Sequence, residues 1–420
     1  MNDLEPPKTQ RFAFGIRILS SLKNPSYRLY LVATIAHFAA MSMQMFSSPL
    51  LIYRLTDSKA LLGTMSLVNA APMILISVFG GVIADRLPKK KILIAGLVGS
   101  AIVAVFIGWS LSSGILNREN SDSWWILFAS SAVQGCIMGL MMPALQAIIP
   151  EIVNRDQLMN AIALNTTGMN VLNLLAPGIA GFIIGDTSNF QTVYFTMSAL
   201  YLVAAVFILL ISAKGQIIAS GNKIIGDIQQ GFHYIRKDSL ILLILAFTLI
   251  VTVLSMPYQQ LLPIFYDDIL KIGATGGGLL MSVSGVGALV GSLILAALPN
   301  KKRGAILLFS GIITGVALII FSFSSYVTLS LIFIFFLGLG QTFRMTIGSA
   351  LLQSYTQGAY MGRVMSILNM QWGFMSLCTF FAGIIAEKID VQWVLGSLAM
   401  VLIVISVFFI IFSSNIRKVD

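Results

Sequence analysis

The chain has 420 residues, of which 57% are hydrophobic and only 10% are charged, and its mean hydropathy is +0.91. Charged residues alone average about 25% in soluble domains, because a soluble fold must cover its core with polar surface. The composition therefore excludes a soluble globular protein and indicates a chain that lies in lipid.

Residues 1–26 are polar and basic, and the apolar run that follows is too long for a cleavable signal peptide. Cys136 and Cys378 lie in apolar runs and predict no disulfide framework. A spanning helix needs roughly 20 apolar residues. That window predicts an all-α polytopic membrane protein with spans at 28–53, 60–84, 91–113, 123–149, 158–184, 190–212, 239–266, 275–298, 304–324, 327–352, 360–386 and 391–413.

Lysine and arginine are distributed unevenly between the alternating loops. With the N-terminus in the cytoplasm, the cytoplasmic loops carry most of the 26 basic residues, and the other loops carry only Arg54, Lys59, Arg118, Lys271 and Lys388. This bias is the positive-inside pattern of membrane proteins. It predicts a cytoplasmic (inner) membrane protein with both termini in the cytoplasm, and it explains the net charge of +10 without nucleic acid.

The longest polar interruption lies near the middle of the chain. Its apolar residues recur at helical spacing between charged ones, which is typical of an amphipathic helix on a membrane surface. The dipeptides Met65-Ser66 and Leu164-Asn165 recur as Met281-Ser282 and Leu368-Asn369 in the corresponding spans of the second half. The sequence therefore predicts an N-terminal segment, a six-helix bundle, a linker, a second six-helix bundle and a tail, at 1–27, 28–212, 213–238, 239–413 and 414–420.

The loop after the second span reads Gly81-Val-Ile-Ala-Asp85-Arg86-Leu-Pro-Lys89-Lys90. Glycine lets two helices approach closely, and a carboxylate is stabilised near a helix N-terminus. The segment resembles the Gly-x-x-x-Asp-Arg-x-Gly-Arg/Lys-Arg/Lys signature of the major facilitator superfamily, with proline in place of the second glycine. In that family the cluster latches the two halves together in the outward-open state. The resemblance implies this role for Gly81, Asp85, Arg86, Lys89 and Lys90.

Further segments resemble one branch of that family, the multidrug and secretion-effector transporters, which includes macrolide-efflux and enterobactin-exporter proteins. These segments are 150–153, 161–165, 173–181, 227–236 and 362–366. The resemblance implies the major facilitator fold of two six-helix bundles, no cofactor and a monomer. Many proton-coupled exporters carry Arg-x-x-Gln-Gly in span 4, whereas this chain has Ser131 in place of the arginine, so its route of proton transfer differs from theirs.

In this family spans 1, 4, 7 and 10 line a central cavity, and polar side chains recur on one face of each of these spans. Polar groups within a span belong inside the bundle or against water, and methionines suit a site that adapts to varied ligands. Hydrogen bonding between helices or packing is the alternative role for each residue. The residues expected in the substrate cavity are His37, Met41, Gln44, Gln134, Met138, Thr252, Gln259, Gln341 and Arg344.

Arg344 lies deep in span 10, where a cation costs about 3 kcal/mol or more, and the inner parts of the spans contain no Asp or Glu. We expect it to attract an anionic group of the substrate; the alternative is that its side chain extends to lipid phosphate. His37 is the only residue inside a span that titrates near neutral pH, so we expect any proton coupling to pass through it. Asp267 and Asp268 end span 7, and we expect them to act in gating or solvation.

The expected function is secondary active export of amphiphilic small molecules, either drug-like compounds or secreted metabolites, by alternating access with proton antiport. A lipid or lysolipid transporter of the same fold is the alternative, because an apolar cavity with one cation also suits that substrate. The sequence has no filter motif of a channel, and its two histidines offer no metal or acid–base site. We therefore expect neither a channel nor an enzyme, and the expected partners are the small-molecule substrate and membrane lipids.

Overall fold

The computed structural model describes residues 20–120, 122–154, 157–185, 188–211, 233–299, 301–357, 360–417 and 419, and their side chains except at 20, 78–86, 146, 414 and 415. Twelve helical segments in this part of the chain are long and apolar enough to cross a membrane. The predicted all-α fold with twelve spans is confirmed. The predicted amphipathic linker lies outside the described residues up to 232, and residues 233–237 are helical.

The N-terminal half consists of six long helices. They are α2 (Pro25–Thr56), α3 (Lys59–Arg86), α4 (Lys89–Ser112), α5 (Trp125–Ile152), α6 (Leu158–Ile184) and α7 (Phe190–Leu209), preceded by the short helix η1 (Ser20–Lys23). The side chain of Asn24 accepts hydrogen bonds from the backbone N–H groups of Ser26 and Tyr27, and Pro25 occupies the first helical position of α2. This combination of cap and proline starts α2 slightly before the predicted residue 28.

The C-terminal half also crosses the membrane six times. Its elements are α9 (Ser239–Ser255), α10 (Pro257–Ile264), the π-helix η2 (Phe265–Ile269), α11 (Gly273–Ala297), α12 (Arg303–Phe323), α13 (Val327–Tyr355), α14 (Met361–Asn369), α15 (Gln371–Lys388), α16 (Val391–Phe412) and α17 (Ser414–Arg417). Asp238 caps α9 as Asn24 caps α2, accepting from the backbone N–H groups of Leu240 and Ile241 at 2.9 and 3.2 Å. Each half therefore begins its first span at a side-chain cap.

Spans 7 and 11, predicted over 239–266 and 360–386, are each interrupted in the structure. In span 7, α9 ends at Ser255 and α10 begins at Pro257, whose nitrogen cannot donate the hydrogen bond that would continue the helix. In span 11, Met370 separates α14 from α15. Interrupted helices are tolerated at membrane depth where they are buried in protein or line a cavity.

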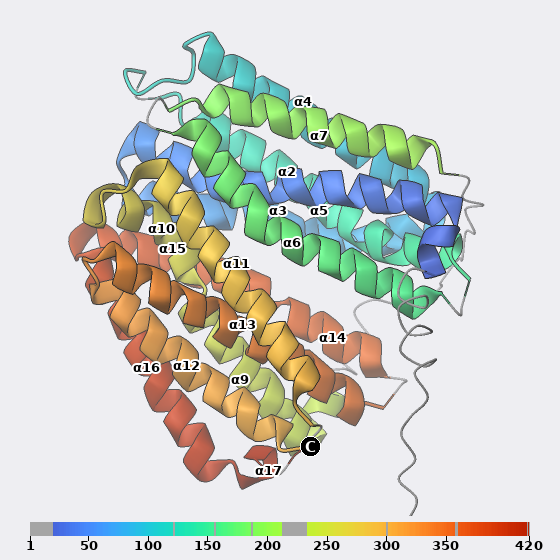
Figure 1. The fold of residues 1–420 in the computed structure, drawn as a ribbon, viewed down its shortest axis with the longest axis vertical. Helices are drawn as coiled ribbons and strands as arrows, with labels where there is room; N and C mark the ends of the chain where they lie inside the picture. Colours follow the sequence, from blue (N-terminus) through green and yellow to red (C-terminus); the bar gives the residue numbers. More distant parts are fainter. Residues whose placement is uncertain are drawn as a thin grey trace, which may run out of the picture.

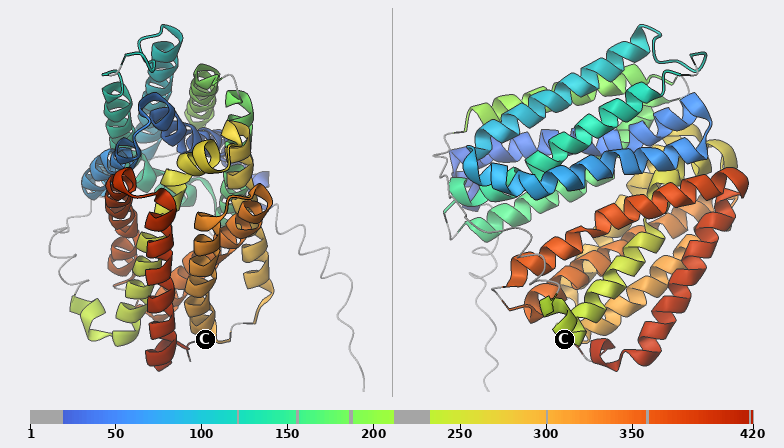
Figure 2. Two further views of the ribbon diagram at one scale, coloured as in Figure 1. Left: turned by 90° about the vertical axis from the view of Figure 1, so that its left-hand side faces the viewer. Right: turned by 180° about the vertical axis from the view of Figure 1, so that it is seen from behind.

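Figure 1 shows the two halves as separate bundles that approach each other at one end and diverge toward the other. Figure 2 shows the same arrangement from behind. The helix α10 lies where the halves approach, and α14 and the C-terminus lie at the opposite end (Figure 1). We call the first end, which carries Arg54, Gly63 and Asp267, the sealed end. The second end, which carries Lys89 and Arg363, is the linker end.

Two helix pairs join the halves, α3 with α15 and α6 with α11. Near the sealed end both pairs cross at glycines. A Cβ added to Gly63 would lie 2.9 Å from the Cα of Gly383, and one added to Gly278 would lie 3.2 Å from the Cα of Gly181. Glycine at these positions lets the helix backbones approach closely, because a side chain there would have to push the helices apart.

Candidate functional site

Two basic residues of the predicted motif, Lys89 and Lys90, make contacts inside the N-terminal half. Lys89, at the start of α4, forms an ion pair with Glu151, at the end of α5. Lys90 Nζ donates to the carbonyl oxygen of Ile211, just after α7, at 2.8 Å. A cation there stabilises the negative end of the helix dipole. The backbone of α3 includes Gly81, Asp85 and Arg86, whose side chains lie outside the described part of the chain.

The predicted polar stripe on α2 faces α7, a helix of the same half. Gln44 Oε1 accepts a hydrogen bond from the Tyr201 hydroxyl at 3.1 Å, and the ring centroids of His37 and Tyr201 are 5.8 Å apart. Both ring nitrogens of His37 are buried without a hydrogen-bond partner among the described residues. Met41, between these two positions, is half-buried. Helical spacing predicted the shared face correctly, but in this conformation that face meets α7 and not the space between the halves.

The predicted residues of α5 are also paired within their own half. Gln134 Nε2 donates to Ser100 Oγ of α4 at 3.2 Å. Gln134 and Met138 are buried. In this conformation the predicted cavity residues of the N-terminal half therefore contribute to packing between its own helices.

The predicted residues of the C-terminal half come together around Arg344. Its Nη1 donates to Thr252 Oγ1 at 2.5 Å and to Gln371 Oε1 at 3.3 Å. The Thr252 hydroxyl lies 3.0 Å from Gln371 Oε1 and 2.8 Å from the Thr248 carbonyl oxygen, and it can donate to either. Arg344 is only 2% exposed. Its guanidinium is therefore held inside the bundle and does not extend to the membrane surface.

A second set of polar side chains lies one turn away. Gln259 Nε2 is 3.5 Å from Gln341 Oε1, and Gln341 Nε2 is 3.4 Å from the Tyr258 hydroxyl. Gln341 and Arg344 are three residues apart on α13, so they lie on the same face of that helix. We call the two sets together the polar cluster: Thr252, Tyr258, Gln259, Gln341, Arg344 and Gln371.

The two helix interruptions place the polar cluster near the middle of the spans. Thr252 lies in the last turn of α9, just before the break at Pro257, and Gln371 is the first residue of α15. With a rise of about 1.5 Å per residue, Thr252, Arg344 and Gln371 each lie about 15–20 Å along their helices from the linker end. Because α15 packs against α3 of the other half, the cluster lies beside the interface between the halves.

Gln371 and Tyr258 belong to the polar cluster but were not predicted from the sequence. The predicted cavity residues all lie on spans 1, 4, 7 and 10. Gln371 was missed because it lies in span 11. One signal was available: Gln371 is a glutamine that directly precedes a long apolar run, and an uncharged polar group inside a span usually bonds to another helix.

Polar contacts between the halves hold the sealed end together. Arg54 Nε and Nη2 lie 2.8 and 3.0 Å from the two carboxylate oxygens of Asp267. The Tyr53 hydroxyl donates to Asp268, and Glu387 accepts the backbone N–H of Ala60 at 3.0 Å. In each contact the carboxylate belongs to the C-terminal half and the donor to the N-terminal half. Asp267 and Asp268 therefore take part in contacts between the halves, and their expected role in gating or solvation stays a prediction.

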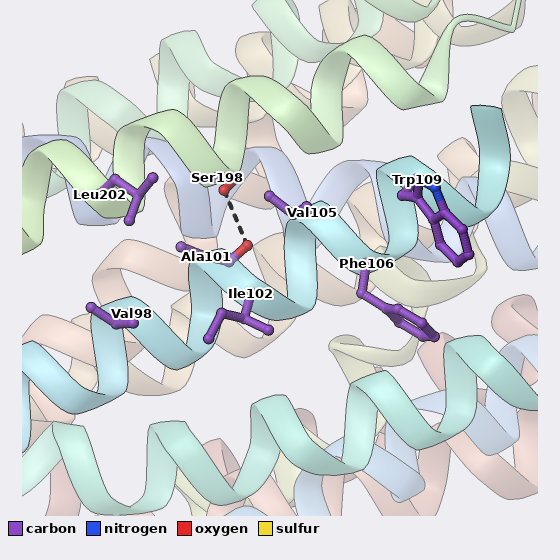
Figure 3. A pocket seen from close by; sticks show the side chains of 8 residues that line it. All are labelled: Val98, Ala101, Ile102, Val105, Phe106, Trp109, Ser198 and Leu202. Atoms are coloured by element: carbon purple, nitrogen blue, oxygen red, sulfur yellow. Dashed lines mark hydrogen bonds between the residues drawn. The ribbon is translucent and has the colours of Figure 1, made fainter. Parts of the chain in front are cut away.

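An apolar groove runs between α4 and α7 on the outer surface of the N-terminal half (Figure 3). The Ser198 hydroxyl at its side is satisfied, since it donates to the Ala101 carbonyl oxygen at 3.0 Å. Because Ile102 and Trp109 are more than half exposed on spanning helices, we assign the groove to the lipid-facing surface and not to the substrate site. Its lining residues are Val98, Ala101, Ile102, Val105, Phe106, Trp109, Ser198 and Leu202.

Curated proteins similar to this chain include three transporters. The staphyloferrin A transporter of Staphylococcus aureus (strain NCTC 8325 / PS 47) is 21% identical over 331 residues, covering 78% of this chain and 81% of that protein. Macrolide efflux protein A of Streptococcus pyogenes is 24% identical over 388 residues, covering 88% and 92%. The enterobactin exporter EntS of Shigella boydii serotype 4 (strain Sb227) is 22% identical over 355 residues, covering 84% and 83%. The predicted resemblance to macrolide-efflux and enterobactin-exporter proteins is confirmed.

Solved structures have the same fold at low sequence identity. A POT family transporter in complex with a thioalcohol-conjugated peptide has a TM-score of 0.75 and 15% identity, covering 93% of this chain and 97% of that one. A bacterial homologue of the human lysosomal transporter Spinster, inward-facing and unoccupied, has a TM-score of 0.69 and 14% identity, covering 94% and 98%. The family model of the Major Facilitator Superfamily matches residues 30–377 and 260–418. The chain therefore belongs to the Major Facilitator Superfamily and is a multi-pass secondary transporter.

Proposed function

We propose that this transporter exports amphiphilic small molecules by alternating access with proton antiport, as a monomer with both termini in the cytoplasm. One observation carries the proposal: the two ends of the molecule differ. The halves are bonded to each other at the sealed end through Arg54 and Asp267, and they diverge at the linker end (Figure 1). A carrier that opens to one side at a time needs such a difference and must reverse it to release its substrate.

Two further observations support export of amphiphiles. Macrolide efflux protein A and the enterobactin exporter are named for outward transport and match most of this chain. The polar cluster is formed by four helices, α9, α10, α13 and α15, which belong to apolar spans, and this suits a ligand with both a polar and an apolar part. The basic residues of the predicted cytoplasmic loops support an orientation with the linker end in the cytoplasm and the sealed end outside.

Asp85→Asn should reduce efflux about tenfold or more without changing the amount of protein in the membrane, because it removes the carboxylate of the predicted family motif. We would measure efflux of a mixed panel of dyes, antibiotics and lysolipids from pump-deficient cells, each with and without a protonophore. For at least one compound, the wild type should increase efflux, and both the mutation and the protonophore should remove that increase.

The matched control is Asp57→Asn, since Asp57 is an exposed carboxylate whose contact with Arg118 is long, at 3.6 Å. This variant should export normally. If no compound leaves the cells faster with wild-type protein, the proposal of amphiphile export is wrong. If lysolipids alone are moved, the protein is instead a lysolipid transporter of the same fold.

We propose His37 as the group that takes up the coupled proton, because imidazole changes charge near neutral pH and no other histidine lies in a span. His37→Gln should make efflux independent of the external pH, measured in reconstituted vesicles with an imposed pH gradient. His233→Gln is the control, since His233 is exposed in the helical residues before α9. Normal pH dependence in His37→Gln would show that coupling uses another group.

A further inference from the structure

Arg344 is a buried cation without a counter-ion in the described part of the chain. The ion pairs found there join Arg54 to Asp267, Lys89 to Glu151 and Arg118 to Asp57. The hydrogen bonds of Arg344 go to Thr252 and Gln371, which are both neutral. Neutral acceptors compensate only part of the cost of removing a cation from water. The site therefore has an uncompensated positive charge.

The buried polar atoms around Arg344 that lack a hydrogen-bond partner are groups that can donate. Arg344 Nε and Thr248 Oγ1 are buried without a partner among the described residues. The two side chains lie on adjacent turns of packed helices, since a Cβ on Gly348, one turn beyond Arg344, would lie 2.9 Å from Thr248 Oγ1. A guanidinium N–H can only donate, and a hydroxyl can donate. The missing partner is therefore an acceptor, and the uncompensated charge of Arg344 favours an anion as that acceptor.

Arg344 has one edge of its guanidinium available for this partner. All of its hydrogen bonds in the described part use Nη1, which leaves the edge formed by Nε and Nη2. The same edge of Arg54 binds the carboxylate of Asp267, with Nε and Nη2 at 2.8 and 3.0 Å from the two oxygens. Two parallel hydrogen bonds from this edge match the planar geometry of a carboxylate. Arg54 thus provides an example, within this protein, of what Arg344 could bind.

The interruption in span 11 favours an anion at the same place. Gln371, which accepts from Arg344, is the first residue of α15. The N-terminus of a helix carries partial positive charge and presents backbone N–H groups, so it adds to the field of Arg344. No acidic side chain lies in the inner part of a span. The described part of the chain therefore has no carboxylate at this depth.

We infer that Arg344, assisted by Thr248 and the start of α15, binds the carboxylate of an amphiphilic substrate, whose negative charge completes the site. This inference rests on the proposed export of amphiphiles and narrows it to anionic ones. The substrate carboxylate compensates the charge of Arg344, and it thereby lowers the cost of closing the two halves around the site. A neutral substrate of the same shape leaves that charge uncompensated.

The test uses two probes that differ only in charge: an undecanoate with a dansyl group at its far end, and the methyl ester of the same compound. We would measure binding to the purified full-length protein in detergent by dansyl fluorescence, and efflux from reconstituted vesicles. The wild type should bind the carboxylate about tenfold more tightly than the ester or better. Arg344→Gln should reduce carboxylate affinity to that of the ester and leave ester affinity unchanged.

Two further variants keep the test informative if Arg344→Gln does not fold. Arg344→Lys keeps the charge but loses the two-point geometry, so it should retain part of the preference for the carboxylate. Thr248→Val removes one donor and should weaken carboxylate binding a few-fold. Arg28→Gln is the matched control, since it removes an exposed arginine near the start of α2, and it should change neither affinity.

The two proposals fail in different ways. Equal affinity of the wild type for both probes would overturn the anionic substrate class, while efflux of either probe would leave amphiphile export in place. If Arg344→Gln still binds the carboxylate more tightly than the ester, the anion binds at another site and the inference is wrong. If the protein neither binds nor exports either probe, then both the inference and the proposed export of amphiphiles are wrong for this class of compound.

Discussion

Replacing Gly383 by alanine should open the sealed end of the transporter and stop transport. A Cβ at this position would lie 2.7 Å from the Lys59 carbonyl oxygen and 2.8 Å from the Cα of Gly63. Both are backbone atoms, so α15 and α3 must separate. Overpacking of this kind costs about 1–3 kcal/mol. That cost falls on the conformation closed at the sealed end, so it should shift the balance toward the opposite conformation by about 5- to 150-fold.

The shift can be measured with a cysteine reporter at Ser47, which is fully buried two turns below Arg54 on α2. In purified protein carrying Cys136→Ser and Cys378→Ser, maleimide should label the Ser47→Cys variant about tenfold faster once Gly383→Ala is added. Gly168→Ala is the control, because a Cβ there would lie 3.6 Å from Ile35 Cγ1, an ordinary contact. Slow labelling and normal efflux in Gly383→Ala would show that the two helices need not approach at this glycine.

The number of the spans, and their bounds to within about three residues, could be predicted from the sequence because lipid imposes a length on every apolar run. The break in span 7 also has a visible cause, since Pro257 lacks the N–H that would continue the helix. The break at Met370 has no such signal. It depends on how α14 and α15 pack against their neighbours, which a local pattern does not contain.

The predicted cavity residues contact one another in the C-terminal half but contact other helices in the N-terminal half, and their role in binding substrate stays a prediction. Thr252 and Arg344 were both expected in the substrate cavity. In the structure they lie within hydrogen-bonding distance of each other. Helical spacing also predicted that His37 and Gln44 share a face, and both contact Tyr201. Spacing specifies which residues share a face, but it does not specify which neighbouring helix that face meets. In the N-terminal half, the packing of α2 against α7 determines which helix the face of His37 and Gln44 meets.

The contacts of the sealed end could not have been paired from the sequence. Arg54 and Asp267 lie far apart along the chain. In the sequence each is a charged residue at the end of a span, and nothing near either one indicates its partner. Their pairing follows from the way the two halves approach. In the structure both side chains are largely buried, at 23% and 16% exposed, and they share two hydrogen bonds.

Reversing the charge of Arg54 should therefore open the sealed end, and reversing Asp267 as well should close it again. Arg54→Asp places two carboxylates together in a partly buried site, which should cost more than the 1–3 kcal/mol or so expected from an unpaired buried group. Maleimide labelling of the Ser47→Cys reporter should then be more than about tenfold faster than in the parent. In the double variant Arg54→Asp with Asp267→Arg, the pair is restored with opposite polarity, and labelling should slow substantially.

The rescue separates a specific contact from a general loss of stability, because a merely damaged protein would not recover when a second charge is reversed. Arg118→Ala is the matched control, since Arg118 and Asp57 form an exposed pair, 71% and 70% accessible, and such pairs contribute little. Fast labelling in the double variant would mean that the charges act separately and not as a pair. Slow labelling in Arg54→Asp alone would mean that the glycine crossings hold the sealed end closed without this ion pair.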